Sequence, residues 1–128
     1  MASGVINSGE LTKYDRLTIA NVAFNTANTE VNVVKGQHLI NFNCSAIYPI
    51  STIPTNGSLK VFSITNLSQS ELAKISYKTI PLVIMTSASV VVGTAVGLVW
   101  TDGSFYICTN NRAVNVGEKV VGESTFWI

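Results

Sequence analysis

The sequence predicts an all-β domain, an antiparallel β-sandwich or jelly-roll-like barrel, and three observations lead to this prediction. The β-branched residues Val, Ile and Thr supply about a third of the 128 residues, and they suit a pleated, half-buried surface. Short apolar runs recur at intervals of roughly 8–12 residues, separated by turns rich in Gly, Asn and Pro. Only one stretch, residues 66–74, has a helical character.

The first two strands are expected at residues 17–24 and 30–34. A polar cluster at 25–28 ends the first strand, and Lys35-Gly36 ends the second. A longer strand follows over 38–48, and its apolar residues alternate with polar ones, which predicts one dry face and one wet face. The dry face contains Ile40, Phe42, Cys44, Ala46 and Tyr48. The wet face contains Asn41, Asn43 and Ser45.

The middle of the chain continues the alternation of turns and strands. Pro49 and Pro54 bracket a loop, and Asn56-Gly57 forms a turn into a strand over 58–64. The helical stretch at 66–74 is long enough for one or two turns, with Ser68 or Ser70 as its N-cap. Strands are expected over 76–85, interrupted or edged at Pro81, and over 90–92.

A hairpin over residues 96–109 is the strongest local signal. Asp102-Gly103 is a dipeptide typical of the two central positions of a type I′ turn. Counting outward from it pairs Trp100 with Phe105 and Leu98 with Ile107, and these four residues are expected to face the core. The final strand, 124–128, is apolar to its last residue and is expected to dock in the sheet.

Composition limits the possible functions. Charged residues make up only 12% of the chain and the net charge is +1, so the basic surface required for nucleic-acid binding is missing. There is no apolar stretch of 18 residues and no signal peptide, which predicts synthesis in the cytoplasm, or an excised domain with an added start Met, without membrane insertion. The low charge favours an oligomer that buries part of its surface over a monomer coated by Asn, Ser and Thr.

The residues that usually carry catalysis are sparse. His38 is the only histidine and no serine lies in a nucleophile elbow, so neither a catalytic triad nor a transition-metal site is expected. The seven acidic residues fall mostly in predicted turns, which leaves a glycoside hydrolase possible but without support. Cys44 and Cys108 are interpreted as buried free thiols, with a bridge between them left open. We therefore predict neither an enzyme nor a cofactor or metal.

A binding surface is the remaining hypothesis. Asn and Ser side chains bond sugar hydroxyls in both directions, and an aromatic ring stacks on the apolar face of a pyranose. The alternative for each candidate residue is an ordinary solvated strand face or loop. The candidate saccharide-binding residues are His38, Asn41, Asn43, Tyr48, Trp100, Asp102, Asn111 and Arg112.

Residues 80–128 resemble the head domains of phage receptor-binding proteins at tail tips and baseplates. The resemblance consists of Ile80-Pro81-Leu82, the apolar hairpin around Asp102-Gly103, a turn with Gly117, and the closing strand 124–128. It implies a homotrimeric head at the tip of the phage tail in the virion, which binds a host cell-wall saccharide and contacts other tail proteins. The alternative is a structural baseplate or capsid-decoration protein without sugar binding. Residues 16–128 would form the head, and residues 1–15, an arm or linker, lack the collagen-like or coiled-coil neck of such proteins.

Overall fold

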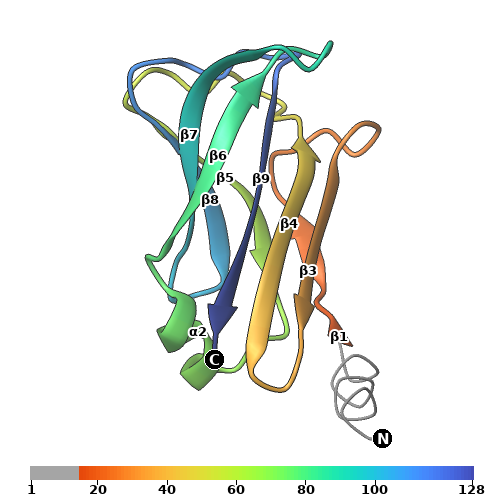
Figure 1. The fold of residues 1–128 in the computed structure, drawn as a ribbon, viewed down its shortest axis with the longest axis vertical. Coiled ribbons are helices and arrows are strands. Elements are labelled where there is room, and N and C mark those ends of the chain that lie inside the picture. Colours follow the sequence, from red (N-terminus) through yellow and green to blue (C-terminus); the bar gives the residue numbers. More distant parts are fainter. Residues whose placement is uncertain (1–14) are drawn as a thin grey trace, which may run out of the picture.

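The computed structural model describes residues 15–128, so most of the expected arm lies outside the described residues. This part of the chain forms nine strands and one short helix (Figure 1). The elements are β1 (Asp15–Arg16), β2 (Ile19–Asn21), β3 (Glu30–Lys35), β4 (Leu39–Ile47), β5 (Ser58–Ile64), α2 (Gln69–Ile75), β6 (Thr79–Met85), β7 (Val91–Val99), β8 (Ser104–Thr109) and β9 (Lys119–Trp127). Every strand pairing is antiparallel, which confirms the predicted fold class.

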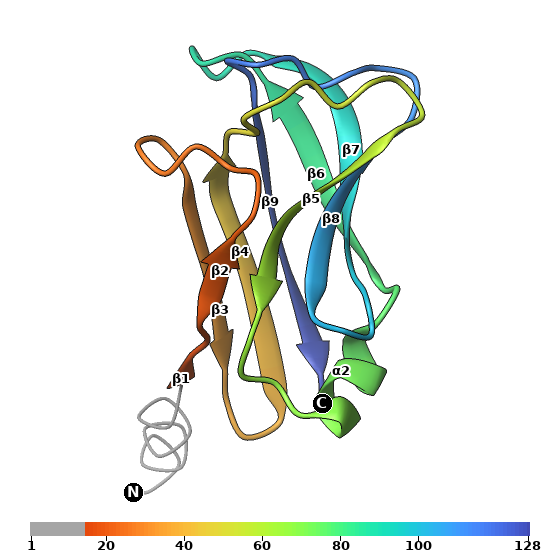
Figure 2. The same ribbon diagram turned by 180° about the vertical axis from the view of Figure 1, so that it is seen from behind.

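The strands form one sheet that curls around the core, in the order β1-β3-β4-β9-β6-β7-β8-β5-β2. The two edge strands, β1 and β2, are separated by only two residues in the sequence. The Leu17 amide donates to Val33 beside β1, and the Thr18 carbonyl accepts from Thr65 beside β2. Residues 15–21 therefore fasten both edges of the sheet and close the curled structure seen in Figures 1 and 2.

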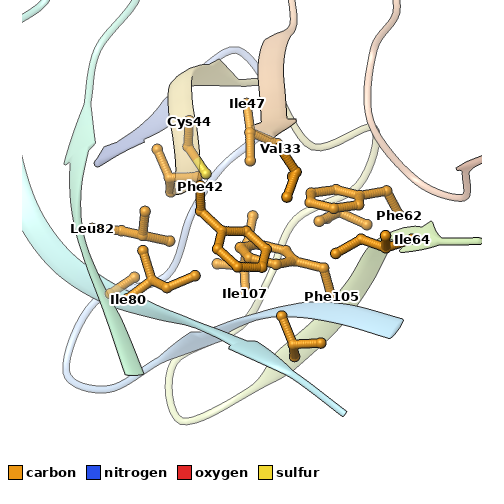
Figure 3. Packing of buried hydrophobic residues seen from close by; sticks show 14 of the residues in the cluster. Val33, Phe42, Cys44, Ile47, Phe62, Ile64, Ile80, Leu82, Phe105 and Ile107 are labelled. Carbon is orange, nitrogen blue, oxygen red and sulfur yellow. The ribbon is translucent and has the colours of Figure 1, made fainter. Parts of the chain in front are cut away.

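The interior is a continuous apolar core formed by inward-facing Val, Ile, Leu and Phe side chains from most of the strands (Figure 3). Phe105 lies at its centre, stacked on Phe62 at 4.4 Å between ring centroids and on Phe42 at 6.1 Å. Gly97 makes room for this ring, because a Cβ on Gly97 would lie 2.5 Å from Cζ of Phe105. Phe42 comes from β4, and Phe62 and Phe105 from β5 and β8, so the stack joins opposite walls of the curled sheet.

Most expected elements are present, with shifts at their ends. The strand expected over 17–24 is reduced to β2, because the amides of Val22 and Ala23 both donate to Val61 and form an irregular turn away from the sheet. The helix is α2, capped by Ser68 rather than Ser70. The piece expected at 90–92 extends into the nine-residue β7, and β6 starts at Thr79, after the helix. β9 confirms the docked C-terminal strand.

The long strand contains a bulge that its alternating pattern does not reveal. Phe42 and Cys44 are buried as predicted, but the register of β4 against β9 shifts between Cys44 and Ile47. Ile47 is consequently in the core, and Ala46 and Tyr48 are only half-buried. Their assignment to the dry face was wrong, because one extra residue reverses the direction of the side chains that follow it.

The hairpin is also displaced by one residue from its predicted register. Trp100 donates to the Ser104 carbonyl and accepts from the Gly103 amide, which leaves a three-residue loop, Thr101 to Gly103. Gly103, and not Asp102, has a positive φ (+88°), so the loop is a turn followed by a glycine bulge instead of a type I′ turn. Phe105 therefore pairs with Val99 rather than Trp100. Phe105 and Ile107 face the core as expected, whereas Trp100 is exposed and Leu98 half-buried.

The two cysteines are free. Cys44 is fully buried on β4, and burial raises the pKa of its thiol to about 12. Cys108 is half-buried on β8, where burial also raises its pKa. Both thiols are therefore protonated at neutral pH and have little nucleophilic character.

Candidate functional site

The eight candidate residues do not converge on one site. His38, Asn41 and Asn43 lie at the start of β4 and on its outer face. Tyr48 follows the other end of that strand. Trp100 and Asp102 lie at the β7–β8 turn, and Asn111 and Arg112 lie in the β8–β9 loop.

The outer face of β4 holds a polar network whose hydrogen bonds are already made. The Asn41 amide donates to Oε2 of Glu123 at 3.1 Å and to Oγ1 of Thr125 at 2.9 Å. Asn43 accepts from the Ser45 hydroxyl at 3.1 Å. A shallow hollow of about 290 Å³ lies beside Asn41, lined also by Val34, Leu39 and Thr125. The side-chain N–H donors of Asn41 are therefore engaged within the sheet.

Arg112 and Asp102 have structural roles. The Arg112 guanidinium donates to both carboxylate oxygens of Glu118, at 2.7 and 2.8 Å, and to the carbonyl of Ala113. These hydrogen bonds are the main cause of the lowered pKa of Glu118. Asp102 accepts from the Ser104 amide at 3.0 Å, which lowers its pKa and fastens the β7–β8 turn. Asn111 is exposed in the same loop as Arg112.

Tyr48 lies in a cleft formed by four loops at one end of the sandwich. Its volume is about 420 Å³. The residues that line this loop cleft are Asn25, Asn28, Tyr48, Pro49, Ile50, Ser87, Val116 and Gly117. They come from the β2–β3, β4–β5, β6–β7 and β8–β9 loops, which gather at the upper end in Figure 1.

Backbone hydrogen bonds hold the first two of these loops together. The Asn25 amide N–H donates to the Tyr48 carbonyl at 2.8 Å, and the Tyr48 N–H donates to Oγ1 of Thr29 at 3.0 Å. The Ile50 N–H donates to the Ala23 carbonyl at 3.0 Å. Three hydrogen bonds between residues 23–29 and 48–50 therefore build one wall of the cleft.

The other two loops are held by internal hydrogen bonds. The Thr86 N–H donates to the Val90 carbonyl, and the Val90 N–H donates to Oγ1 of Thr86. Between them, Ser89 has a φ of +66°. Glu118 anchors the remaining loop, because its carboxylate accepts from the Asn115 amide while it binds Arg112. The role of Arg112 is thus to hold the loop that presents Val116 and Gly117 to the cleft.

The lining of the cleft is uncharged and retains hydrogen-bonding capacity. The side chains of Asn28, Tyr48 and Ser87 have no hydrogen-bond partner within residues 15–128, and the amide nitrogen of Asn25 is likewise available. Beside them Ile50 and Val116 are 58% and 63% exposed, which is unusual for large apolar side chains. Such a surface suits a neutral ligand with both hydroxyl groups and apolar C–H faces.

Sequence reasoning found Tyr48 but missed its neighbours. Asn25 and Asn28 were assigned only to a turn, and Ser87 and Val116 carried no signal. The four segments are far apart in the chain, and only the topology of the sheet brings their loops to one end. The usable signal would have been the number of strands, because consecutive strands from β2 onward alternate in direction and every second connection therefore lies at the same end.

Within residues 15–128 there is no group of three or more His, Cys, Asp or Glu side chains that could hold a metal ion. No helix in the same part of the chain has the length and apolar character needed to cross a bilayer. Comparisons with protein-family models, curated proteins and solved structures gave no match to this chain.

Proposed function

We propose that this protein is a non-catalytic adhesion head of a phage tail that binds a saccharide of the host cell surface in the loop cleft. The observation that carries the proposal is the lining of that cleft, in which amide and hydroxyl groups without internal partners surround exposed apolar side chains. Loops at one end of a rigid β scaffold are a common place for binding sites.

The chemistry of the lining favours a sugar over other ligand classes. An anionic or cationic ligand would leave its charge uncompensated, because none of the eight lining residues is charged. A neutral pyranose offers hydroxyls that both donate to and accept from the amides of Asn25 and Asn28. Its C–H face can pack on Ile50 and Val116, and the Tyr48 ring can add a stacking surface.

The proposal is tested by binding of fluorescently labelled protein to an array of bacterial cell-wall glycans and to whole bacteria. Asn28→Ala removes an exposed amide of the cleft and Tyr48→Phe removes only the phenol oxygen. Each is expected to weaken binding roughly five- to twentyfold, the loss of one or two ligand hydrogen bonds. Asn111→Ala is the matched control outside the cleft and should bind as the wild type does. Binding unaffected by both cleft variants would contradict the assignment.

A structural role in the virion, as a baseplate or capsid-decoration protein, is the second candidate. It is favoured by the exposure of large apolar side chains outside the cleft, among them Val22, Val90, Val91 and Trp127. Such residues together with a low charge are typical of a surface covered by other subunits. Light scattering measures the mass in solution, where the adhesion proposal expects a homotrimer. An oligomer that binds a purified tail protein but no bacterium or glycan would support the structural role instead.

A further inference from the structure

Three aromatic side chains form an exposed patch at the other end of the molecule from the loop cleft. The Trp100 ring stacks on Tyr106, with 4.5 Å between centroids and 27° between planes. Tyr77 lies 6.2 Å from Trp100 at an angle of 56°. Tyr77 is 58% exposed and Trp100 is 41% exposed. This aromatic patch lies by the β7–β8 turn and the end of α2, at the lower end of Figure 2.

The backbone of Tyr77 is held in a conformation that its side chain disfavours. It follows the helix C-cap Ser76 and has a φ of +62°, where glycine is the usual residue. A bulky residue there is strained relative to an ordinary backbone conformation. The Tyr77 N–H donates to the Val99 carbonyl at 2.9 Å, which fixes the ring beside Trp100. Glycine would end the helix with less backbone strain. The helix end therefore does not explain the Tyr77 side chain, which points to a function for its ring.

The surroundings of the patch are polar and charged. Lys60 is the strand partner of Tyr106 on β5, and Lys78 follows Tyr77 in the chain. Asp102 follows Trp100 by two residues in the chain. The centre of a protein–protein interface is depleted in charge, and Lys and Asp are among the residues it avoids. Aromatic rings framed by hydrogen-bonding side chains instead match a sugar, whose C–H face stacks while its hydroxyls reach the rim.

We propose that the aromatic patch is a second saccharide-binding surface, on which successive pyranose rings of a neutral glycan chain stack. This inference rests on the proposed saccharide-binding function but concerns a separate site. A head with sites at both ends binds two segments of wall polymer at once. After the first site has bound, the second site meets the polymer at a high effective concentration, which strengthens the overall binding. The cleft would take one sugar unit among its loops, whereas the open patch would take the flat face of a chain.

Tryptophan fluorescence tests the patch directly, because the chain has only two tryptophans. Trp127→Phe leaves Trp100 as the sole reporter, and Trp127 is 75% exposed on β9, where phenylalanine can replace it. Titration of this variant with cellohexaose, chitohexaose and maltohexaose is expected to change the Trp100 emission with at least one of them. The matched control, Trp100→Phe, keeps Trp127 and should show no change.

Tyr77→Gly removes one ring and relieves the backbone. It should remain folded by circular dichroism and bind the responding hexasaccharide roughly two- to tenfold more weakly, the loss of one stacking contact. Unchanged Trp100 emission with all three hexasaccharides would overturn the second site. A blue shift that grows with protein concentration in the absence of sugar would also overturn it, because a second copy would then cover the patch. Whole-cell binding that is lost in Asn28→Ala but unaltered in Tyr77→Gly would leave the cleft standing and reject the patch.

Discussion

Gly103 and Gly117 both have a positive φ, but they differ in the atoms that surround them. Comparing the two residues therefore separates the conformational cost of adding a Cβ from the cost of a steric clash. Their φ values are +88° and +94°, in the region that L-residues with a Cβ rarely adopt. A Cβ on Gly103 would lie 2.4 Å from the carbonyl oxygen of Ile64, whose N–H donates to the Gly103 carbonyl. A Cβ on Gly117 would meet no atom of the described chain within 4 Å.

Gly117→Ala is therefore expected to cost only the conformational term, about 1 kcal/mol of unfolding free energy. Gly103→Ala carries the same term and adds a clash with backbone, so we expect a loss of about 3 kcal/mol or more. Urea denaturation of the two variants measures the difference. Equal losses would show that the Ile64 backbone can move away without cost.

The sequence indicated the types of side chain that line the cleft better than it indicated which residues lie there. Asn and aromatic residues were expected to bind sugar, and Tyr48 lies in the cleft while Trp100 lies in the aromatic patch. Arg112 looks like a ligand-binding residue in the sequence, but its guanidinium is engaged with Glu118. Whether a polar side chain is free depends on its partners across the fold, and these are not visible from local sequence.

At the scale of elements, α2 shows how a seven-residue helix can form at a defined position. The Ser68 hydroxyl accepts from the Glu71 N–H at 3.2 Å, and the Glu71 carboxylate accepts from the Ser68 N–H at 3.0 Å. This capping box satisfies two amides that the first turn leaves unpaired. Glu71 also forms an ion pair with Lys35 of β3 at 3.0 Å, which attaches the helix to the sheet.

Ser68→Ala removes the cap and is expected to lower the free energy of unfolding by about 1 kcal/mol. Gln69→Ala, at the next position and exposed, is the control and should change it by less than about 0.5 kcal/mol. Thermal unfolding followed by circular dichroism gives both values. A loss in the control equal to that in Ser68→Ala would mean that the cap has no specific role.

Local irregularities of single strands explain the two errors of register. Strand positions and the helix were predictable because hydrophobic periodicity and turn residues are local signals. The bulge after Cys44 and the three-residue loop before Ser104 each add one residue between paired positions. A single extra residue leaves the pattern of apolar residues almost unchanged but reverses which face they occupy. Trp100 was placed in the core for this reason alone.

Three carboxyl groups link the stability of the whole molecule to pH. The pKa of Glu71 is lowered mainly by its hydrogen bond from the Ser68 backbone, and that of Asp102 mainly by the Ser104 backbone. The pKa of Glu118 is lowered mainly by Arg112. In each case the unfolded chain binds a proton at a higher pH than the folded chain. Their stabilising effect is complete above the ordinary carboxyl values of 4.5 and 3.8 and disappears as the pH falls through the lowered ones.

Unfolding free energy is therefore expected to decrease as the pH is lowered below about 4.5, the ordinary value for a glutamate. Glu118→Gln should flatten part of this dependence, since its carboxyl no longer titrates. Glu30→Gln, which removes an exposed carboxyl on β3, is the control for the loss of one negative charge. Urea titrations at several pH values between neutral and acid give the slope, and a slope that Glu118→Gln leaves unaltered would contradict the assignment.

The segment at residues 15–21 that fastens both sheet edges also determines how the molecule carries tension. Strand β1 lies at the lower end of Figure 1, and the loops that line the cleft lie at the upper end. A pull between Asp15 and a sugar held in the cleft runs along the strands, so it loads the hydrogen bonds of β1 and β2 in shear and all together. Bonds loaded in this way do not open one after another. For a head that holds a cell against flow, fastening both sheet edges in this way would raise the force needed to unfold the domain while it is attached.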